Sequence, residues 1–587
     1  MKQLQAETLK GTSFKDGTLL DVLGERHVSA FRQLLPEEHK PLFGKRTWGS
    51  LCSGSEGAHF ATTACASAIG AWNTASGQEP LQLEQLFACE SVRAKRKWIH
   101  QLVNEDRRAK GQKEVCIFID ILHMGQRTAY CETHNCHCEV PDVDILLVST
   151  SCKDLSWLST AARNFAEPVL SMETSPGGSA DTFAAFLAYL DNHSASMVIY
   201  ENSDHMVDDH AAPQANTNQD VFQSQMSARF YEGQDFLINA KFYGCPQRRR
   251  RFLAAYIKTV GGIIGFDERT VFDQITTLIT LLQVCKRSCP PARDLLLPDD
   301  DLLLQTELLE MLAKPDRINE KTTWQNDHHK EYSKFNTQWG SDPPCKATKV
   351  SPWLPILNAY QRSLLTLNQH KVLAKGARLT STAPGRRSTA SGQQSTDSVQ
   401  ALSPGGRRQI PVLMIDVRPS IGRLSTSTYD EYCRQEIAPC IVPDQRLWLH
   451  IETPRPMLGR EALHFQGWPI SKVELQPWMT DSFLYGLAGN AVACPVLLAL
   501  LMATVSAVSI KDKDIPADIS WSNADEDDQA AALLLLADVA TVFDQSIFRS
   551  PTRRLRSLTS HAAPARRREP LLFAVLWAYP APQQPPE

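Results

Sequence analysis

The stretch Asp144-Ile-Leu-Leu-Val-Ser-Thr-Ser-Cys-Lys-Asp-Leu-Ser156 decides the fold, because it reads as a buried strand that ends in a thiol, Cys152. A second apolar strand, Val198-Ile-Tyr-Glu-Asn202, ends in a carboxylate, Glu201. In an open parallel sheet, the carboxyl ends of the strands face the ligand crevice. A thiol and a carboxylate delivered to one crevice can act as nucleophile and acid–base partner. The two strand ends therefore predict an α/β fold with a reactive crevice.

Strand-like and helix-like segments alternate from Arg46 to Ile257, a pattern typical of an α/β protein with a parallel sheet. Helices are expected at Val92–Val103 and Thr182–Leu190. We therefore predict a Rossmann-like, doubly wound, mostly parallel sheet. The expected strands are Thr47–Cys52, Leu86–Cys89, Val115–Asp120, Asp144–Val148, Met197–Tyr200 and Arg251–Tyr256.

The chain has 587 residues, too many for one compact core, so more than one domain is expected. Residues 1–40 read as a helical lead-in, and residues 258–350 are irregular. Residues 371–408 are rich in Ser, Thr, Gly and Pro with seven basic residues and one acid, which predicts a disordered basic linker. The tail at 508–587 is first acidic and then basic and proline-rich, and we expect disorder there too.

Composition limits the partners and the compartment. Lys and Arg total 61 against 65 Asp and Glu, so the net charge of −4 argues against a uniformly basic nucleic-acid coat but permits a local basic groove. The 15 cysteines, and a polar start without the apolar core of a signal peptide, favour a reducing compartment, cytosol or nucleus.

One apolar run, Ala491–Ile510, contains no charged residue and is long enough to span a membrane. Pro495 stands where a first-turn proline belongs, and Thr504, Ser506 and Ser509 dilute the apolar pattern. We therefore expect a buried core helix and no membrane partner.

Three successive strand ends carry residues suited to a nucleoside-bearing cofactor. The first is followed by the glycine-containing loop Ser50-Leu-Cys-Ser-Gly-Ser-Glu-Gly57, where backbone can approach a ligand closely. The second ends at Glu90, an acid that suits ribose hydroxyls, and the third at Asp120. Each feature alone is as easily a solvated strand end, but three in order favour a cofactor pocket.

A basic run, Gly244-Cys-Pro-Gln-Arg-Arg-Arg-Arg-Phe252, leads into the last predicted strand. It can be read as a solvated turn or a nuclear-import signal. Gln247, Arg249 and Arg251 alternate, however, so in extended chain they project to one face, where guanidiniums can hold an anion or a base carbonyl.

Together these segments resemble the cytosine-5 methyltransferase family, which uses S-adenosylmethionine. The resemblance covers roughly residues 45–257 and 450–507. The matching segments are Cys52-Ser-Gly-Ser-Glu-Gly57, Glu90, Asp120-Ile121, Ser151-Cys-Lys-Asp-Leu-Ser156, Glu201-Asn-Ser203, Tyr243-Gly-Cys-Pro246, Gln247 with Arg249 and Arg251, Arg460 to Pro469, and Gly489-Asn-Ala-Val492.

The resemblance implies a class I methyltransferase fold with its catalytic domain at 41–257, a variable target-recognition domain at 258–450, and a segment at 451–507 that returns to the catalytic domain. It also implies the roles of the site residues. The catalytic residues would be Cys152, Glu201, Arg249 and Arg251, and the cofactor-binding residues Ser53, Gly54, Gly57, Glu90, Asp120, Ile121, Asn490 and Ala491.

The implied reaction is methyl transfer to carbon 5 of a cytosine in DNA, through a covalent bond from Cys152 to carbon 6. Glu201 would act at ring nitrogen 3, Arg251 at the carbonyl oxygen, and Asn202 would orient the loop that carries Cys152. A duplex cytosine would have to be flipped out of the helix. We expect a nuclear protein, with an organelle or the cytoplasm as alternatives; its protein partners are not indicated.

Departures from the family pattern leave two other readings open. Ser151 replaces a proline and Lys153 a glutamine beside the nucleophile, and Glu56 places an acid in the glycine loop. These changes favour a degenerate methyltransferase-like protein that binds DNA or cofactor without turnover. The same chemistry on tRNA is the third reading, which the long region 258–450 weakens.

The run Cys131-Glu-Thr-His-Asn-Cys-His-Cys138 holds five potential zinc ligands in eight residues. The spacing is too tight for one regular zinc finger, and the family does not require a metal there. We expect a surface loop of reduced thiols and no metal.

Overall fold

A computed structural model of the chain describes residues 19–36, 39–155, 168–172, 177–208, 216–260, 264–265, 268–284, 292–313, 323–333, 351–368, 413–417, 437–443, 447–450 and 453–510. All of these residues belong to one compact unit, Met1–Ile515. A second unit, Pro516–Glu587, lies outside the described residues, as do residues 1–18 and the predicted linker at 371–408.

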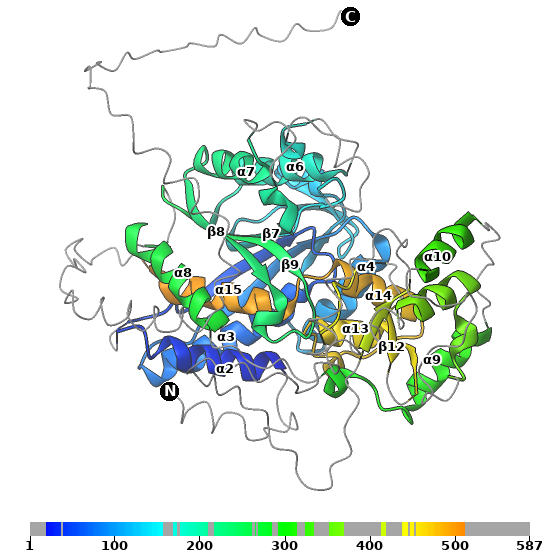
Figure 1. Cartoon of the computed structure of the whole chain (residues 1–587). Coiled ribbons are helices and arrows are strands. Elements are labelled where there is room, and N and C mark those ends of the chain that lie inside the picture. Colours follow the sequence, from blue (N-terminus) through cyan, green and yellow to red (C-terminus); the bar gives the residue numbers. More distant parts are fainter. Residues whose placement is uncertain are drawn as a thin grey trace, which may run out of the picture. The chain divides into compact units, whose positions relative to one another are not determined.

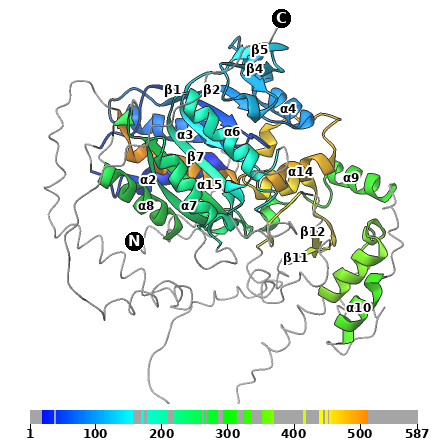
Figure 2. The same ribbon diagram turned by 90° about the horizontal axis from the view of Figure 1, so that it is seen from above.

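A sheet of nine strands organises this unit, in the order β5-β4-β3-β2-β1-β6-β7-β9-β8 (Figures 1 and 2). Strands β1, β2, β3, β6 and β7 run parallel, β9 runs antiparallel between β7 and β8, and β4 and β5 form an antiparallel hairpin at the other edge. The strands are β1 (Lys45–Leu51), β2 (Gln82–Cys89), β3 (Cys116–Phe118), β4 (Thr128–Cys131), β5 (Cys136–Glu139), β6 (Val143–Val148), β7 (Ala195–Ser203), β8 (Tyr231–Asn239) and β9 (Arg250–Lys258).

The chain runs from β1 outward to β3 and then returns to the other side of β1 at β6, so the sheet is doubly wound. All six predicted strands coincide with observed strands, and the predicted α/β fold is confirmed. A doubly wound sheet binds its ligands outside the carboxyl ends of the strands where the order reverses, here between β1 and β6. Both Cys152 and the loop after β1 lie at this position.

Helices cover both faces of the sheet (Figure 1). The two faces of β6 explain the two cores: Ile145 and Leu147 belong to one apolar cluster, and Leu146 and Val148 to the other, as the alternation of side chains along a strand requires. The first cluster includes residues of α2 (Leu19–Phe31), α3 (Gly57–Ala75), α8 (Glu268–Val284) and α15 (Cys494–Ala507); the second includes residues of α6 (Ser179–Asn192) and α7 (Asn218–Ser227).

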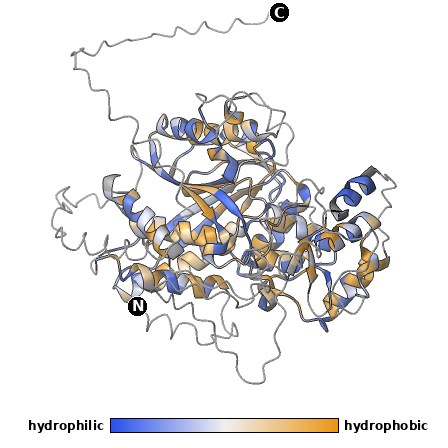
Figure 3. Cartoon of the chain, in the orientation of Figure 1, coloured by the Kyte–Doolittle hydropathy of each residue, from blue (hydrophilic) through white to orange (hydrophobic). Residues whose placement is uncertain are grey.

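Helix α15 is the apolar run noted in the sequence, and every one of its residues is buried. The stretch Asp481–Ala507 is long and apolar enough to cross a membrane by length and composition, yet 89% of its most apolar window is buried inside the fold. Helix α15 contacts α2, α3 and α8, and Figure 3 shows it as hydrophobic in the middle of the protein. Helix α15 is therefore a buried core helix with Pro495 in its first turn, as predicted from the sequence.

Residues beyond β9 build a smaller antiparallel sheet in the order β11-β12-β13, with its own apolar cluster that includes Leu304, Trp353 and Trp448. Two elements within residues 258–450 do not belong to this smaller sheet, since α8 contacts α15 and β10 pairs with β14. The domain boundaries therefore stay predictions. The elements here are β10 (Ile264–Gly265), η6 (Ala292–Leu295), α9 (Leu302–Ala313), α10 (Thr323–Ser333), η7 (Leu354–Ile356), a helix at 359–368, β11 (Leu413–Asp416), β12 (Leu447–His450), β13 (Arg455–Pro456) and β14 (Ser509–Ile510).

Short helices connect these elements. They are α4 (Arg93–Ile99), the π-helical turn η1 (His100–Glu105), α5 (Asp106–Ala109), η2 (Ile121–His123), η3 (Val169–Ser171), η4 (Asp204–Val207), η5 (Ala240–Tyr243), α13 (Gly459–Phe465), η9 (Ile470–Lys472) and α14 (Asp481–Asn490). The predicted helix Val92–Val103 thus continues through α4 into η1, and Thr182–Leu190 lies inside α6.

Candidate active site

The loop between β1 and α3 is a strained turn. Cys52, Gly54 and Glu56 all have left-handed backbone, with φ of 54°, 60° and 62°. This conformation suits glycine but costs other residues about 1–3 kcal/mol each, so the surrounding structure must hold it. Ser53 does so by donating its N–H to the Cys89 carbonyl at 2.9 Å, which fastens the loop to the end of β2.

Glu56 does not face the cofactor side of this loop. Its side chain is 1% exposed, and its carboxylate accepts hydrogen bonds from Ser50 Oγ and from Gln85 Nε2 at 2.9 Å. Burial raises the pKa of Glu56 to about 7, against the lowering effect of these hydrogen bonds. The acid that departs from the family pattern is therefore an internal support of the turn.

A pocket with an empty volume of about 480 Å³, part of it open to solvent, opens beside the loop. The predicted cofactor residues Ser53, Gly57 and Asn490 line it, and so does the predicted catalytic Glu201. The other lining residues are Ser50, Leu51, Cys52, Ser55, Ala58, Leu147, Val148, Ser149, Ile199, Val492 and Leu497.

Glu90, at the end of β2, is 6% exposed and accepts the N–H groups of Gly54 and Val92, each at 2.8 Å. A carboxylate offers about four acceptor positions, so oxygen lone pairs remain for a further donor. Burial raises the pKa of the pocket thiol Cys52 to about 12, and the charges of Glu90 and Asp120 add to this effect. Both acids therefore stand close to the pocket.

The residues fit a nucleoside-bearing cofactor. Glu90 supplies an acceptor for sugar hydroxyls, and the turn at Gly54 brings backbone to the pocket wall. Asp120 accepts the Leu122 N–H at 3.0 Å and so caps η2, in which Ile121 is buried at the end of β3. The loop after β1 lines the pocket, whereas the predicted strand ends at Glu90 and Asp120 lie near it and outside the lining residues.

The carboxyl end of β6 carries Cys152 in a loop that α6 holds in place. The Ser151 N–H donates to Thr182 Oγ1 at 3.0 Å, and Asp154 and Ser179 exchange two hydrogen bonds, at 3.1 and 2.7 Å. Cys152 itself is exposed to solvent. The loop is thereby fixed on both sides of a free thiol.

Asn202 ties this loop to β7. It is 1% exposed, and its amide donates to Thr150 Oγ1 and to Tyr200 Oη, both at 3.0 Å. The Tyr200 and Thr150 hydroxyls are 2.6 Å apart. This buried network sets the backbone just before Cys152, the positioning role predicted for Asn202.

Glu201 and Arg251 form an ion pair at the end of β7, with Arg251 Nε 3.1 Å from Glu201 Oε1. The second carboxylate oxygen of Glu201 accepts a hydrogen bond from Ser149 Oγ at 2.8 Å. Both side chains remain partly accessible, at 13% for Glu201 and 19% for Arg251. The carboxylate is thus oriented by two donors and still reachable from the pocket.

The charges of Glu201 and Arg251 affect the pKa of the Cys152 thiol. Desolvation by the surrounding chain raises its pKa, Arg251 lowers it, Glu201 raises it and Arg249 lowers it, and the net effect is upward. Cys152 is therefore mainly a thiol at neutral pH and needs a base or a bound substrate to react as thiolate.

Arg249 is turned away from this cleft to a buried position, 3% exposed. Its guanidinium donates to the carbonyl oxygens of Ile441 at 2.7 Å, Ala491 at 2.6 Å and Gly489 at 3.2 Å. Arg249 therefore joins β9 to the 437–443 segment and to the end of α14. Its catalytic contact, and the cofactor contact of Ala491, stay predictions.

Gln247 has a similar joining role that the sequence did not indicate. It is fully buried, and its amide donates to Gln466 Oε1 at 2.6 Å and to the Phe465 carbonyl at 3.1 Å. The alternation of Gln247, Arg249 and Arg251 predicted a shared face, but of the three only Arg251 pairs with Glu201.

The family model of the C-5 cytosine-specific DNA methylases matches residues 126–505, well over half of the chain, and the chain therefore belongs to this family. Members use S-adenosylmethionine as methyl donor, which is the cofactor that the pocket fits.

Among curated proteins, the chain is 22% identical over 471 residues to DNA (cytosine-5-)-methyltransferase DMT5 of Cryptococcus neoformans. The match covers 78% of this chain and 17% of that protein, so the chain spans about a sixth of its relative's length.

Two solved structures show a distant likeness. In both cases the match covers 78% of this chain and 98% of the chain in the solved structure. They are Dnmt2 methyltransferase of S. pombe, with 13% identity and a TM-score of 0.36, and the methyltransferase EhMeth of Entamoeba histolytica, with 8% identity and a TM-score of 0.35. The family assignment rests on the sequence match, and the fold on the sheet topology described above.

Proposed function

We propose that this chain is a DNA (cytosine-5)-methyltransferase that works through a covalent adduct at Cys152. The observation that carries the proposal is the pairing of strand ends: an exposed thiol after β6, beside a carboxylate on β7 that is oriented by Arg251 and Ser149. The same carboxylate lines the pocket assigned to the cofactor.

Carbon 5 of cytosine is not nucleophilic in the free base. Attack of the Cys152 thiolate on carbon 6 forms a carbon–sulfur bond and moves the ring electrons toward carbon 5 and nitrogen 3. Glu201 in its protonated form shares a proton with nitrogen 3, and Arg251 faces the carbonyl oxygen, so both stabilise the developing charge. The bound S-adenosylmethionine supplies the methyl group. Loss of the carbon-5 proton and departure of the thiolate then regenerate Cys152.

A cytosine stacked in a duplex cannot bring carbon 6 to a thiol at a strand end, so we propose that the base is flipped into the cleft. A DNA substrate requires a compartment that contains DNA, and we propose the nucleus.

A degenerate protein that binds without turnover is the second candidate. It is favoured by the raised pKa of Cys152, together with the Ser151 and Lys153 replacements beside it. Against it, the supports of the cysteine loop are complete, since Ser151, Asp154 and Thr150 each have a hydrogen-bond partner.

The test is covalent trapping on an oligonucleotide that carries 5-fluorocytosine, in the presence of S-adenosylmethionine. Fluorine at carbon 5 blocks the last elimination, so an active enzyme stays bonded to the DNA on a denaturing gel. We expect an adduct with the full chain and with Cys136→Ser, a control for another exposed thiol, and none with Cys152→Ser.

An RNA oligonucleotide of the same sequence separates the substrates. An adduct on RNA alone would establish the tRNA-type reading in place of the DNA reading. No adduct on either, from protein that still binds the cofactor, would establish the degenerate protein.

A further inference from the structure

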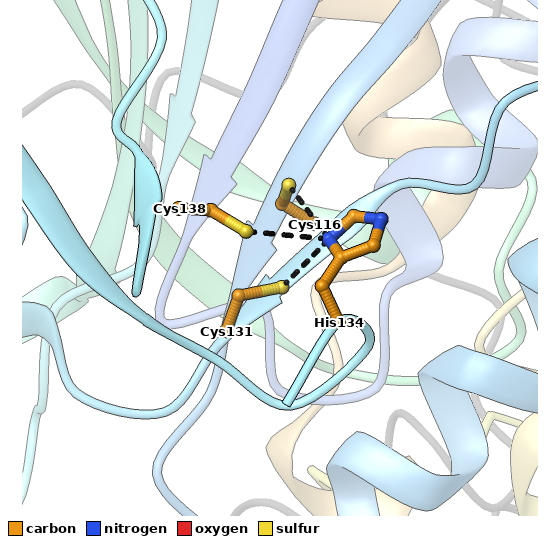
Figure 4. Close-up of side chains that lie close together, drawn as sticks. All are labelled: Cys116, Cys131, His134 and Cys138. Atoms are coloured by element: carbon orange, nitrogen blue, oxygen red, sulfur yellow. Dashed lines mark hydrogen bonds between the residues drawn. The ribbon is translucent and has the colours of Figure 1, made fainter. Parts of the chain in front are cut away.

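Three cysteines and a histidine converge at the edge of the large sheet that is formed by the β4–β5 hairpin (Figure 4). Cys116 begins β3, Cys131 ends β4, His134 lies in the hairpin turn and Cys138 lies in β5. The four side chains point toward one another, and their ligand atoms all lie within 4.8 Å of one another. Cys116, 15 positions before Cys131, is the member that the sequence pattern did not reveal.

The distances match those around a tetrahedral zinc ion. The sulfur atoms of Cys138, Cys131 and Cys116 lie 3.3, 3.4 and 3.6 Å from His134 Nδ1. Zinc bonds of about 2.3 Å to sulfur and about 2.0 Å to nitrogen, at the tetrahedral angle, place the two atoms about 3.5 Å apart.

Hydrogen bonding alone does not account for this arrangement. A neutral imidazole nitrogen has either one lone pair or one N–H, so it can satisfy one partner. Here three sulfur atoms approach the same Nδ1. A cation at the centre of the four atoms would be shared by all of them.

We propose that Cys116, Cys131, His134 and Cys138 form a structural zinc site. Four protein ligands of this kind complete a tetrahedron and leave no open position for water or substrate, which is the pattern of structural rather than catalytic zinc. The prediction of a metal-free loop from the tight 131–138 spacing is replaced by this proposal, because the fourth ligand comes from another strand.

The site would fasten an otherwise weakly joined hairpin. Strand β4 pairs with β3 through a single residue pair, Phe118 with Cys131. Zinc would bond Cys116 on β3 to residues of both hairpin strands and of the turn. The three hairpin ligands would then be linked through the metal to Cys116 of the sheet, in addition to that pair and to the hydrogen bond from the Glu132 N–H to the Ile117 carbonyl at 2.8 Å.

The same turn is linked through Arg96 to the strand end that carries Glu90. Glu132, next to Cys131, pairs with Arg96, and Arg96 donates to the backbone carbonyl oxygens of Glu90 and, at 2.6 Å, Ser91. A fixed turn therefore holds Arg96 against the strand end that carries Glu90.

The decisive measurement is the zinc content of the full chain, purified without chelator, by inductively coupled plasma mass spectrometry. We expect about one zinc per chain in the native protein. Cys116→Ser and His134→Ala should each lower it about tenfold or more. Cys136→Ser is the matched control, because Cys136 is exposed in the same hairpin but lies outside the convergent four, and it should keep its zinc.

A measurement on the native chain guards against variants that fail to fold. Alkylation should spare Cys116, Cys131 and Cys138 while it modifies Cys136, and a chelator should expose the first three. Added cobalt should also give the charge-transfer spectrum of a tetrahedral thiolate site. A native chain that takes up neither zinc nor cobalt would overturn the proposal, as would zinc that persists in Cys116→Ser and disappears in Cys136→Ser.

Discussion

At Cys152, reactivity depends on a balance between desolvation and two arginines. Desolvation and the Glu201 charge raise the pKa of the thiol, Arg251 and Arg249 lower it, and the net shift is upward. An ordinary cysteine has a pKa of about 8.5. The thiolate fraction of Cys152 should therefore rise over a higher pH range than that of a cysteine with an ordinary pKa.

We predict that alkylation of Cys152 by iodoacetamide keeps accelerating above about pH 9.5, one unit above the ordinary cysteine pKa, where an unperturbed thiol levels off. Arg251→Gln removes the larger of the two favourable charges and should slow alkylation further at every pH below the plateau. Quantitative mass spectrometry of the Cys152 peptide follows the rate, with Cys136 as the exposed internal reference. A plateau for Cys152 below that of Cys136 would contradict the prediction.

The predicted catalytic residues differ in how well the sequence indicated their positions in the fold. Cys152 and Glu201 follow apolar strands, so their place at the sheet edge could be predicted from the strand pattern alone. Arg249 could not be placed, because its partners are backbone carbonyls of Ile441 and Ala491, far away in the sequence. Alternation indicates which side chains share a face, but not which partner a long side chain reaches.

At the scale of elements, the loop after β6 compensates for its missing proline. Ser151 has an N–H, which proline lacks, and donates it to Thr182 Oγ1 in α6. Thr182 is 6% exposed and donates its own hydroxyl hydrogen to the Gly178 carbonyl at 2.9 Å. Ser151, which stands where the family has a proline, thus adds a hydrogen bond between the loop and α6.

We predict that Thr182→Val destabilises the chain by about 1–3 kcal/mol, because it leaves the Ser151 N–H without an acceptor. It should also slow covalent trapping, since the loop that carries Cys152 loses a support. Urea unfolding measures the first effect. Thr63→Val is the matched control: Thr63 is exposed on α3, and its loss should cost no more than about 0.5 kcal/mol.

Adding Ser151→Pro to Thr182→Val tests the cause. Proline has no N–H to leave unsatisfied, so the double variant should regain most of the lost stability. If the double variant is less stable than Thr182→Val alone, the hydrogen bond is not the reason for the loss.

A buried ion pair joins the returning segment to the smaller sheet region. Arg455 and Glu461 are each 1% exposed and share two hydrogen bonds, at 2.9 and 2.8 Å. The Glu461 carboxylate also accepts the N–H groups of Leu297 and Leu458, each at 2.8 Å. Four donors on one carboxylate satisfy the buried charge fully.

We predict that Glu461→Gln lowers the free energy of unfolding by about 3–5 kcal/mol, because it leaves the buried Arg455 charge with only the half-exposed Asp299, 3.6 Å away, as an anionic partner among the described residues. Glu474→Gln, at an exposed position, changes the same functional group and should stay within about 0.5 kcal/mol. Equal denaturation midpoints for the two variants would show that the pair contributes no net stability.

Elements were predictable where their pattern was strong. The buried strands β6 and β7 contain apolar runs, and both were predicted from the sequence. Strand β8 mixes Glu232, Gly233 and Asp235 with exposed positions, and β5 is the Cys/His run itself, so neither carries the apolar period of a strand. Both owe their strand conformation to a neighbour in the sheet, which a single sequence does not display.

At the scale of the whole molecule, distant segments complete each site. The pocket combines the loop after β1 with Asn490 and Val492 from the end of the described chain, and the Cys/His cluster needs Cys116 from β3. The family resemblance anticipated the first combination. The second follows only from strand pairing, because no local spacing links Cys116 to Cys131.

Because S-adenosylmethionine binds the folded chain, its effect on stability reports the integrity of the pocket across these segments. A ligand present at 100 times its dissociation constant stabilises the folded state by about 2.7 kcal/mol. For a chain of this size we expect a rise in unfolding temperature of about 2 °C, because the unfolding entropy grows with chain length. Glu90→Gln should reduce the rise, since the amide accepts fewer hydrogen bonds than the carboxylate that meets Gly54 and Val92. Cys152→Ser should keep the full rise, because it leaves the loop after β1 and the hydrogen bond from Gly54 to Glu90 intact. Differential scanning fluorimetry measures the unfolding temperature of each variant with and without the cofactor, and the difference is the rise for that variant. A rise that Glu90→Gln leaves intact and Cys152→Ser abolishes would place the cofactor on the cysteine side of the cleft, against the arrangement derived from β1, β2 and β3.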